Sequence, residues 1–200
     1  MITDDPISFW NNVADYGTWR EFILPKRTDA EFEDEGEREA NNLSVFIKDD
    51  YTVLEYGCGI GRILKYINAK RKIGLDISVK YLDIAGKDKT SEYYLVDKFH
   101  EQVDFIYCLS VIQHNNEIER EKIINNIVDL LKDKGTAVIS FPHIDSTVYV
   151  ETPFVHKFTK DEVEEYGKHF SEYEIIEGNL VNYKNENKCE YNEYFLIGIK

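Results

Sequence analysis

The stretch that decides the fold is residues 53–62, with the sequence VLEYGCGIGR. It begins with β-rich apolar residues and continues into three glycines at the alternate positions Gly57, Gly59 and Gly61. Glycine lets the backbone turn sharply and lets a ligand approach the main chain without a Cβ in the way. The helix-like residues 62–69 that follow would add the free N–H groups of a helix N-terminus. The stretch therefore predicts a strand, a ligand-binding loop and a helix, in that order.

Around this stretch the sequence alternates between strand-like and helix-like segments. The helix-like residues 117–132 carry apolar side chains at the i, i+3, i+4 and i+7 positions, with Asn116 to cap the start and Gly135 to end the helix. A second helix is predicted over residues 79–85. Strands are predicted over residues 51–56, 72–76, 93–96, 103–109 and 136–141. This alternation predicts an α/β fold, a parallel sheet with helices on both faces, whose ligands bind at the carboxyl ends of the strands.

The two ends of the chain add further elements. The pairs Thr28 with Glu31 and Thr159 with Glu162 have the spacing of a capping box, which predicts helices that begin there. We interpret the acidic run of residues 29–39 as a solvated helix face. Residues 173–183 and 191–200 predict an antiparallel pair of strands. We expect an N-terminal helical cap or extension over residues 1–48 and the ligand-binding domain over residues 49–200, together forming a single compact domain.

Composition excludes several classes of function. The 200 residues contain 24 Lys and Arg against 38 Asp and Glu, a formal net charge of −14 that disfavours binding to nucleic acid or anionic lipid. No segment approaches the roughly 20 apolar residues of a membrane span. The first residues lack the features of a signal peptide. Because Cys58, Cys108 and Cys189 are odd in number and widely spaced, they indicate free thiols in a reducing cytoplasm rather than disulfides or a zinc site.

Three carboxylates indicate which ligand the glycine loop binds. A dinucleotide loop would carry its last glycine at the position of Arg62, and Glu55 would face a pyrophosphate badly but suits an amino group. Asp76 ends the second strand, where a carboxylate can accept hydrogen bonds from ribose hydroxyls, and Asp97 follows the third, where it can accept from the exocyclic amine of adenine. These residues together indicate an adenosine that carries an amino acid. The alternatives are an ordinary turn, a loop for another nucleotide and, for Asp76 alone, a helix cap.

At these residues the chain resembles the class I S-adenosylmethionine-dependent methyltransferases. Residues 55–61 (EYGCGIG) match the first motif of that family and residues 74–76 (GLD) match the second. Residues 110–114 (SVIQH) resemble the segment beside the methyl donor, and residues 130–136 (LLKDKGT) resemble a leucine, leucine, lysine, proline, glycine, glycine turn. The resemblance spans about residues 45–200. It implies a Rossmann-like, seven-stranded, mostly parallel sheet whose last strand is antiparallel, with S-adenosylmethionine as cofactor and S-adenosylhomocysteine as product.

The resemblance also implies donor-binding residues. Along the strands and the loop these are Glu55, Gly57, Cys58, Gly59, Gly61, Asp76, Ile77, Val96, Asp97, Leu109 and Ser110. In related enzymes an aromatic-rich extension such as residues 7–24 covers the donor, so Tyr16 or Trp19 would face the sulfonium by cation–π attraction and Arg20 would meet the carboxylate. The alternative is that this segment is an amphipathic helix packed on the sheet.

Candidate catalytic residues follow the fourth and fifth strands. His114 and His143 lie where a general base would be needed for a hydroxyl acceptor, with structural roles as the alternative. No paired acids follow the fourth strand, so we expect no metal. We expect a methyltransferase that acts on an oxygen or nitrogen of a small molecule. The alternatives are a non-catalytic protein that binds the donor in a regulatory role, and a protein or RNA methyltransferase. The sequence predicts no oligomeric state.

Overall fold

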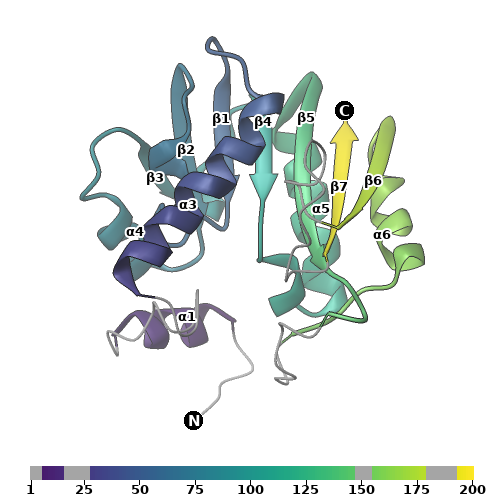
Figure 1. The fold of residues 1–200 in the computed structure, drawn as a ribbon, viewed down its shortest axis with the longest axis horizontal. Helices are drawn as coiled ribbons and strands as arrows, with labels where there is room; N and C mark the ends of the chain where they lie inside the picture. The colour runs from purple at the N-terminus through teal and green to yellow at the C-terminus, as the bar shows by residue number, and fades with distance from the viewer. Residues whose placement is uncertain (1–5, 16–27, 147–154, 179–192) are drawn as a thin grey trace. The chain divides into compact units, whose positions relative to one another are not determined.

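The computed structural model describes residues 6–15, 28–146, 155–178 and 193–200. The chain divides into two compact units, Met1–His100 and Glu101–Lys200, which are described in turn. Seven strands form the sheet, in the order β3-β2-β1-β4-β5-β7-β6 (Figure 1).

The first unit contains three parallel strands and most of the short helices. Its strands are β1 (Thr52–Tyr56), β2 (Arg71–Asp76) and β3 (Glu92–Leu95), and β2 pairs with both of the others. Its helices are α1 (Pro6–Asp15), α3 (Asp29–Leu43) and α4 (Val79–Ala85), with 3-10 turns η1 (Ser44–Phe46), η2 (Leu64–Tyr66) and η3 (Val96–Lys98).

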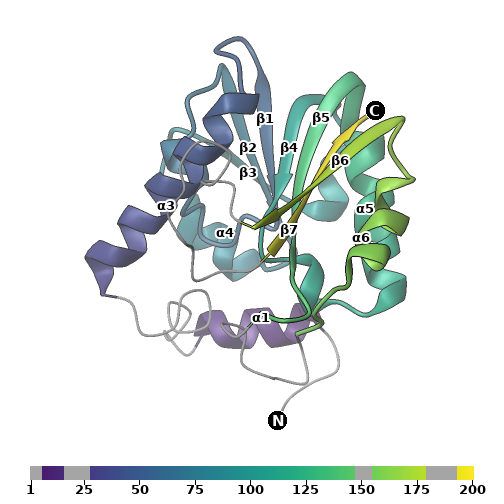
Figure 2. The same ribbon diagram turned by 45° about the vertical axis from the view of Figure 1, so that its right-hand side comes forward.

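The second unit contains four strands. Its longest described helix comes between the first and second of these strands in the chain. Its strands are β4 (Val103–Cys108), β5 (Leu131–Pro142), β6 (Glu172–Gly178) and β7 (Glu193–Ile199). Its helices are α5 (Glu117–Leu130) and α6 (Lys160–Gly167), which lie side by side in Figure 2, and η4 (Ile112–His114) follows β4. Strand β7 runs antiparallel to β5 and to β6. The predicted fold, with an antiparallel last strand, is therefore confirmed.

Strands of both units contribute fully buried residues to the core. Val53 and Leu54 of β1 and Ile73 and Leu75 of β2 are fully buried in the first unit. In the second unit Val103 and the four residues of β4 from 105 to 108 have no exposed surface. Near-continuous apolar runs of this kind are typical of strands that are covered on both faces.

Local sequence signals set the helix starts as predicted. Thr28 with Glu31 and Thr159 with Glu162 each form a reciprocal capping box, at the first turns of α3 and α6. The side chain of Asn116 accepts a hydrogen bond from the N–H of Glu119 and caps α5. Because each of these signals acts within three residues, the rest of the fold does not override it.

Two predictions about helices are wrong. The helix expected over residues 62–69 is a single 3-10 turn, Leu64–Tyr66. Gly61 has a left-handed φ of 74° and Ile67 is already extended at ψ 131°, so only five residues between them are free to be helical. Gly135 does not end α5. That helix stops at Leu130, and the following Leu131 begins β5 with an extended ψ of 139°.

Helix α3 is fixed to the chain that follows the glycine loop. A Cβ on Gly36 would lie 2.7 Å from the carbonyl oxygen of Arg62 and 2.9 Å from its Cγ, so the two backbones approach closely there. The guanidinium of Arg62 forms an ion pair of 2.6 Å with Glu39 and lies 5.4 Å from the centre of the Phe32 ring. Burial raises the pKa of Glu39, and the neighbouring Arg62 opposes that rise.

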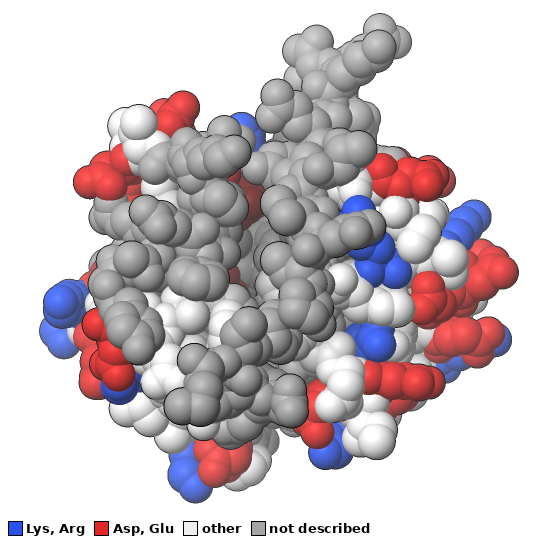
Figure 3. Space-filling view, turned by 90° about the horizontal axis from the view of Figure 1, so that it is seen from below, with Lys and Arg blue, Asp and Glu red and all other residues white. Residues whose placement is uncertain are grey.

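The surface that the structure describes is acidic and mixed. On the face drawn in Figure 3, Asp and Glu side chains are interspersed with those of Lys and Arg. No helix within the described ranges is long and apolar enough to cross a membrane.

We expect the substitution Gly36→Ala to destabilise the protein, although alanine is the better helix former by about 1 kcal/mol. The added methyl group must displace the backbone at Arg62, and such overpacking costs roughly 1–3 kcal/mol. Urea unfolding measures the difference. Glu37→Ala, at an exposed position of the same helix, is the control and should stay within about 0.5 kcal/mol of the parent. Equal or greater stability of Gly36→Ala would contradict the close approach.

Candidate functional site

The glycine loop begins at the carboxyl end of β1 and has the backbone conformation that only glycine adopts readily. Gly57, Gly59 and Gly61 have φ angles of 78°, 52° and 74°, all in the left-handed region. The N–H groups of Gly57 and Cys58 both donate to the carbonyl oxygen of Leu75, over 2.7 and 2.9 Å. The loop therefore folds across the end of β2, which explains why the sequence needs glycine at alternate positions.

Asp76, the last residue of β2, holds this loop from the other side. Its Oδ2 accepts a hydrogen bond of 2.8 Å from the N–H of Gly59, and its Oδ1 accepts one of 2.8 Å from the N–H of Ser78. The residue is only 7% exposed. Ser78, not Asp76, is the N-cap of α4, because its Oγ accepts from the N–H of Tyr81. The carboxylate thus joins the loop after β1 to the turn after β2.

Burial gives the Asp76 carboxyl an unusual acidity. Desolvation raises its pKa from 3.8 to about 6, against the opposing effect of hydrogen bonds from the N–H groups of Ser78, Gly59 and Ile77. An oxygen of an ionised carboxylate has two lone pairs, so Oδ1 and Oδ2 each keep capacity for another donor besides Gly59 and Ser78. A vicinal pair of hydroxyl groups supplies donors of the kind that fit.

Helix α1 lies against the start of α4, and α4 begins shortly after Asp76 in the chain. Asn11 Oδ1 accepts a hydrogen bond of 2.8 Å from the hydroxyl of Ser78, and the rings of Trp10 and Tyr81 are 6.2 Å apart. Asp15 and Lys80 form an ion pair between the same two helices. The N-terminal extension therefore contacts the turn that carries Asp76. Tyr16, Trp19 and Arg20, for which donor contacts were predicted, lie outside the described residues.

Glu55 and Cys58 occupy buried positions on either side of the bend. Glu55, in β1, is 5% exposed. Burial raises the pKa of the Cys58 thiol well above its ordinary value, and the charges of Asp76 and Glu55 raise it further. The thiol therefore stays protonated near neutral pH and is not suited to act as a nucleophile or a metal ligand.

Tyr93, in strand β3, contacts the glycine loop, which the sequence did not predict. A Cβ on Gly61 would lie 2.5 Å from the Tyr93 hydroxyl oxygen, and a Cβ on Gly74 would lie 2.7 Å from its Cδ1. The tyrosine ring thus occupies the space that these two glycines leave. Gly74 within a strand was the available signal, because glycine in a strand interior often marks a close approach.

The region after β3 departs from the tight geometry of the loop. Asp97 is in η3 with its side chain 69% exposed and forms an ion pair of 2.7 Å with Lys98. The Lys98 ammonium lowers the pKa of Asp97. Val96 beside it and Ile77 after β2 are half-buried. The structure thus places Gly59 and Asp76 in direct contact and leaves Asp97 at the surface.

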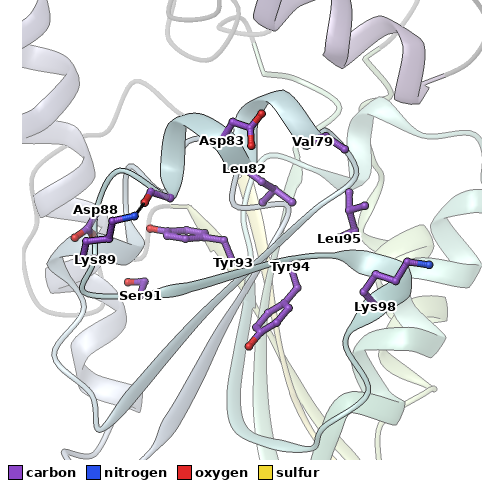
Figure 4. Close-up of a pocket in the computed structure, with 11 residues that line it drawn as sticks. Val79, Leu82, Asp83, Asp88, Lys89, Ser91, Tyr93, Tyr94, Leu95 and Lys98 are labelled. Carbon is purple, nitrogen blue, oxygen red and sulfur yellow. Dashed lines mark hydrogen bonds between the residues drawn. The ribbon is translucent and has the colours of Figure 1, made fainter.

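A cavity of about 540 Å³ lies between α4 and β3 (Figure 4). Val79 and Leu82 of α4 and Tyr93 and Leu95 of β3 contribute to its lining. None of the predicted donor residues that the structure describes is part of this lining. Of the residues that line the cavity, Tyr93 also fills the space beside Gly61 of the glycine loop.

In the second unit, the segment after β4 begins with a strained residue. Ser110 is a non-glycine residue with a left-handed φ of 57°, and its N–H donates to Ser140 Oγ over 2.9 Å. Leu109 before it and His114, at the end of η4, are half-buried. Strain of this kind is maintained only where surrounding contacts hold it, and it occurs often at functional sites.

Two of the histidines after β5, His143 and His156, have partners within the second unit. His143 Nδ1 accepts a hydrogen bond of 3.0 Å from the N–H of Asp145, and its Nε2 lies 3.3 Å from a carboxylate oxygen of Glu177. This arrangement favours the tautomer with the proton on Nε2, so action as a base requires the Glu177 contact to open. His156 Nε2 lies 2.9 Å from Glu162. Within the described ranges, no group of three or more His, Cys, Asp or Glu side chains is placed to hold a metal ion.

The strand order, the antiparallel β7 and the glycine loop fixed by an acid at the end of β2 define the fold of S-adenosylmethionine-dependent methyltransferases. Residues 18–187 match the profile of a methyltransferase-domain family, and the chain belongs to that family. The resemblance inferred from residues 55–61 and 74–76 is thus confirmed.

Solved structures of low sequence identity share this fold. The magnesium protoporphyrin IX methyltransferase of Synechocystis PCC 6803, with bound S-adenosylhomocysteine, is 12% identical, with 97% of each chain covered and a TM-score of 0.68. A possible histamine N-methyltransferase of Thermotoga maritima is 15% identical, with 96% and 98% covered and a TM-score of 0.64. A plantazolicin methyltransferase, in complex with a desmethyl analogue and S-adenosylhomocysteine, is 16% identical, with 96% and 93% covered and a TM-score of 0.66.

An uncharacterised protein of Methanocaldococcus jannaschii, MJ0638, is 30% identical over 107 residues. The match covers 52% of this chain and 46% of that protein, so the chain matches about half the length of this curated relative.

We expect the affinity for S-adenosylmethionine to depend on the ionisation of Asp76. Ribose hydroxyls donate to a carboxylate, so below the pKa of about 6 the affinity should fall, approaching tenfold per pH unit. Calorimetry of donor binding between pH 5 and 8 measures this dependence. Asp76→Ala should weaken binding by roughly 1–3 kcal/mol at pH 8 and remove the pH dependence.

The same raised pKa has the opposite effect on stability. The folded state takes up a proton more readily than the unfolded chain between pH 3.8 and about 6, so the stability that Asp76 contributes falls as the pH rises through this window.

Donor affinity that is equal at pH 5 and pH 8, or unchanged in Asp76→Ala, would remove Asp76 from the donor site.

Proposed function

We propose that the chain is an S-adenosylmethionine-dependent methyltransferase that transfers the methyl group to an oxygen or nitrogen of a small-molecule acceptor. The observation that carries the proposal is the buried Asp76 carboxylate, which holds the Gly59 N–H and retains lone pairs for ribose hydroxyls. Membership of the methyltransferase-domain family supports the enzyme class. The structures of relatives with S-adenosylhomocysteine or S-adenosylmethionine support the cofactor.

The residues of the first unit fit such a donor. The left-handed Gly57 and Gly59 leave the main chain free of Cβ atoms where the ligand would approach, and Glu55 offers a negative charge for the amino group. Asp76 would bind the ribose and Asp97 the adenine amine, with Ile77 and Val96 as half-buried contacts beside them. The extension, with α1 against Ser78, would cover the donor, and its predicted boundary at residue 48 remains part of the proposal.

The chemistry asks little of the protein beyond positioning. The bound donor would supply a methyl group that is attached to a positively charged sulfur, and the leaving group is a neutral thioether. The chain must hold the acceptor atom in line with that group, at roughly 3–3.5 Å, and exclude water. An acceptor hydroxyl also needs a group that takes its proton. We assign this role to His114, which follows β4 and is half-buried, and keep His143 as the second candidate.

Charge supports a small acceptor. The net charge of −14 opposes the phosphate contacts that a nucleic-acid substrate requires. In the part of the chain drawn in colour in Figure 3, Lys and Arg are dispersed among Asp and Glu rather than gathered in a basic groove. A protein that binds the donor without catalysis remains the alternative, and only turnover separates it from an enzyme.

Turnover with isotopically labelled S-adenosylmethionine tests the proposal. Incubation with a cell extract should place the label in the small-molecule fraction and release S-adenosylhomocysteine. Gly59→Leu, which cannot adopt the φ of 52° without strain, is the matched control and should abolish both labelling and donor binding while the fold is retained. Label in protein or RNA would favour the alternative acceptors. Donor binding without any labelled product would favour a non-catalytic role.

We expect His114→Ala to reduce kcat and to remove the lower limb of the pH–rate profile if the acceptor is a hydroxyl, because the general base is then absent. The size of a general-base contribution is typically 10²–10⁴-fold. Donor affinity should be unchanged. An unchanged rate together with an unchanged pH profile would exclude His114 as the base.

A further inference from the structure

Gln113, at the centre of η4, has a buried side-chain amide that is unpaired within the described part of the chain. The residue is 1% exposed. Among the described residues, neither its side-chain nitrogen nor its side-chain oxygen has a hydrogen-bond partner. A buried polar group left in this state destabilises the folded protein, and an amide presents two such groups. An apolar residue of the same length would avoid that cost, so the amide needs an explanation other than stability.

The backbone around Gln113 is held firmly, so the amide cannot easily rotate to solvent with its segment. Its carbonyl oxygen accepts a hydrogen bond of 2.9 Å from the N–H of His156. Two residues later, the side-chain amide of Asn115 donates to the carbonyl oxygen of Val111 over 2.8 Å. The segment thus contains one amide that is used to build the turn and one that is not.

The neighbourhood of Gln113 combines aromatic rings with a second buried polar group. The rings of His156 and Phe158 are 4.5 Å apart, edge to face. On Phe158 lies the guanidinium of Arg120, 5.2 Å from the ring centre, and this arginine is 8% exposed. His114, the next residue in the chain, and His156, whose N–H donates to the Gln113 carbonyl oxygen, are partly exposed, so the backbone of Gln113 adjoins residues that reach the surface.

We infer that the Gln113 side chain binds the acceptor and selects molecules with an N–H donor next to a carbonyl or ring-nitrogen acceptor, such as an aromatic carboxamide or a lactam. A carboxamide offers one donor and one acceptor side by side, so it pairs in two-point fashion with a partner that offers the same. A carboxylate offers only acceptors and an ammonium only donors, and each would leave half of the amide unpaired. A nearby buried guanidinium also disfavours a cationic acceptor.

This inference rests on the proposed small-molecule acceptor and deepens it. A site that hydrogen-bonds a substrate discriminates strongly against analogues that lack the group, because its own buried polar atoms are then left unpaired. Gln113 would therefore be a specificity-determining residue of the second unit, separate from the donor loop of the first.

Stability separates this role from a structural one. Gln113→Met keeps the length of the side chain and removes the amide, so we expect the melting temperature to rise by roughly 2–4 °C. The matched control is Asn115→Leu, which removes an amide that has a partner and should lower the melting temperature. Donor affinity should be unchanged in Gln113→Met. A melting temperature that falls as much in Gln113→Met as in Asn115→Leu would show that the amide is structural and overturn the inference.

Benzamide is the binding probe, because it presents a planar carboxamide on an aromatic ring. Added to the enzyme loaded with S-adenosylhomocysteine, it should raise the melting temperature of the wild type and not that of Gln113→Met, and benzoate should raise neither. A wild type that does not respond to benzamide, or a response that is equal in the variant, would overturn the assignment.

Turnover distinguishes the two levels of the proposal. With labelled S-adenosylmethionine and a cell extract, the methylated products of the wild type should carry an N–H group next to a carbonyl or ring nitrogen. Gln113→Met should form these products at least about tenfold more slowly when the methyl acceptor is limiting. Equal rates in both proteins would contradict the role of Gln113 and leave the methyltransferase intact. A wild type that labels no small molecule would contradict the proposed acceptor class itself, and the benzamide and melting experiments would still decide whether Gln113 binds an amide.

Discussion

The first unit depends on one contact, the hydrogen bond from the N–H of Gly59 to the carboxylate of Asp76. It brings together a loop that follows β1 and a turn that follows β2, seventeen positions apart in the chain. Without it, the three left-handed glycines at alternate positions of the loop would have little to hold them in one conformation, because glycine loses more conformational freedom on folding than any other residue. The N–H of Ser78 on the other carboxylate oxygen extends the same link to the start of α4, and Asn11 extends it to α1.

The hydrogen bonds that Asp76 accepts offset only part of the free-energy cost of burying its carboxylate. Burial raises the pKa of Asp76 to about 6 although several backbone N–H groups donate to it. Holding this carboxylate in its ionised form at neutral pH therefore lowers the stability of the folded protein. A neutral side chain would form the turn at lower cost. The position is therefore better explained by a ligand that donates further hydrogen bonds than by the needs of the fold alone, which agrees with the tendency of perturbed acidities to mark functional sites.

The sequence predicts those features that short-range chemistry determines. The capping boxes at Thr28 and Thr159 and the glycines of the loop act within a few residues, and the structure has them as predicted. The helix over residues 62–69 failed because Gly61 extends the left-handed turn too far and leaves room for one turn only. The start of this segment instead contacts α3, through the ion pair between Arg62 and Glu39.

Contacts between distant residues were not predictable from one sequence. Nothing in the local pattern around Tyr93 indicates that its ring fills the space beside Gly61 and Gly74, because that contact follows from the parallel register of β2 and β3. Gln113 was part of a recognised motif, but a glutamine in a sequence does not reveal whether its amide has a partner. The exposure of Asp97, which the spacing alone had placed at the donor, likewise emerges only from the 3-10 turn that carries it.

The two units differ in how they can recognise a ligand, and this difference has a consequence for specificity. In the first unit the loop offers main chain that is free of Cβ atoms at Gly57 and Gly59, beside a carboxylate fixed by main-chain donors, and main-chain groups persist through most substitutions. In the second unit the groups after β4 and β5 are side chains, among them His114, Gln113 and His143. A single substitution there replaces a donor or an acceptor without disturbing β4 or β5. A fold arranged in this way can keep one methyl donor while its acceptor changes, so the acceptor must be argued from these side chains and not from the fold.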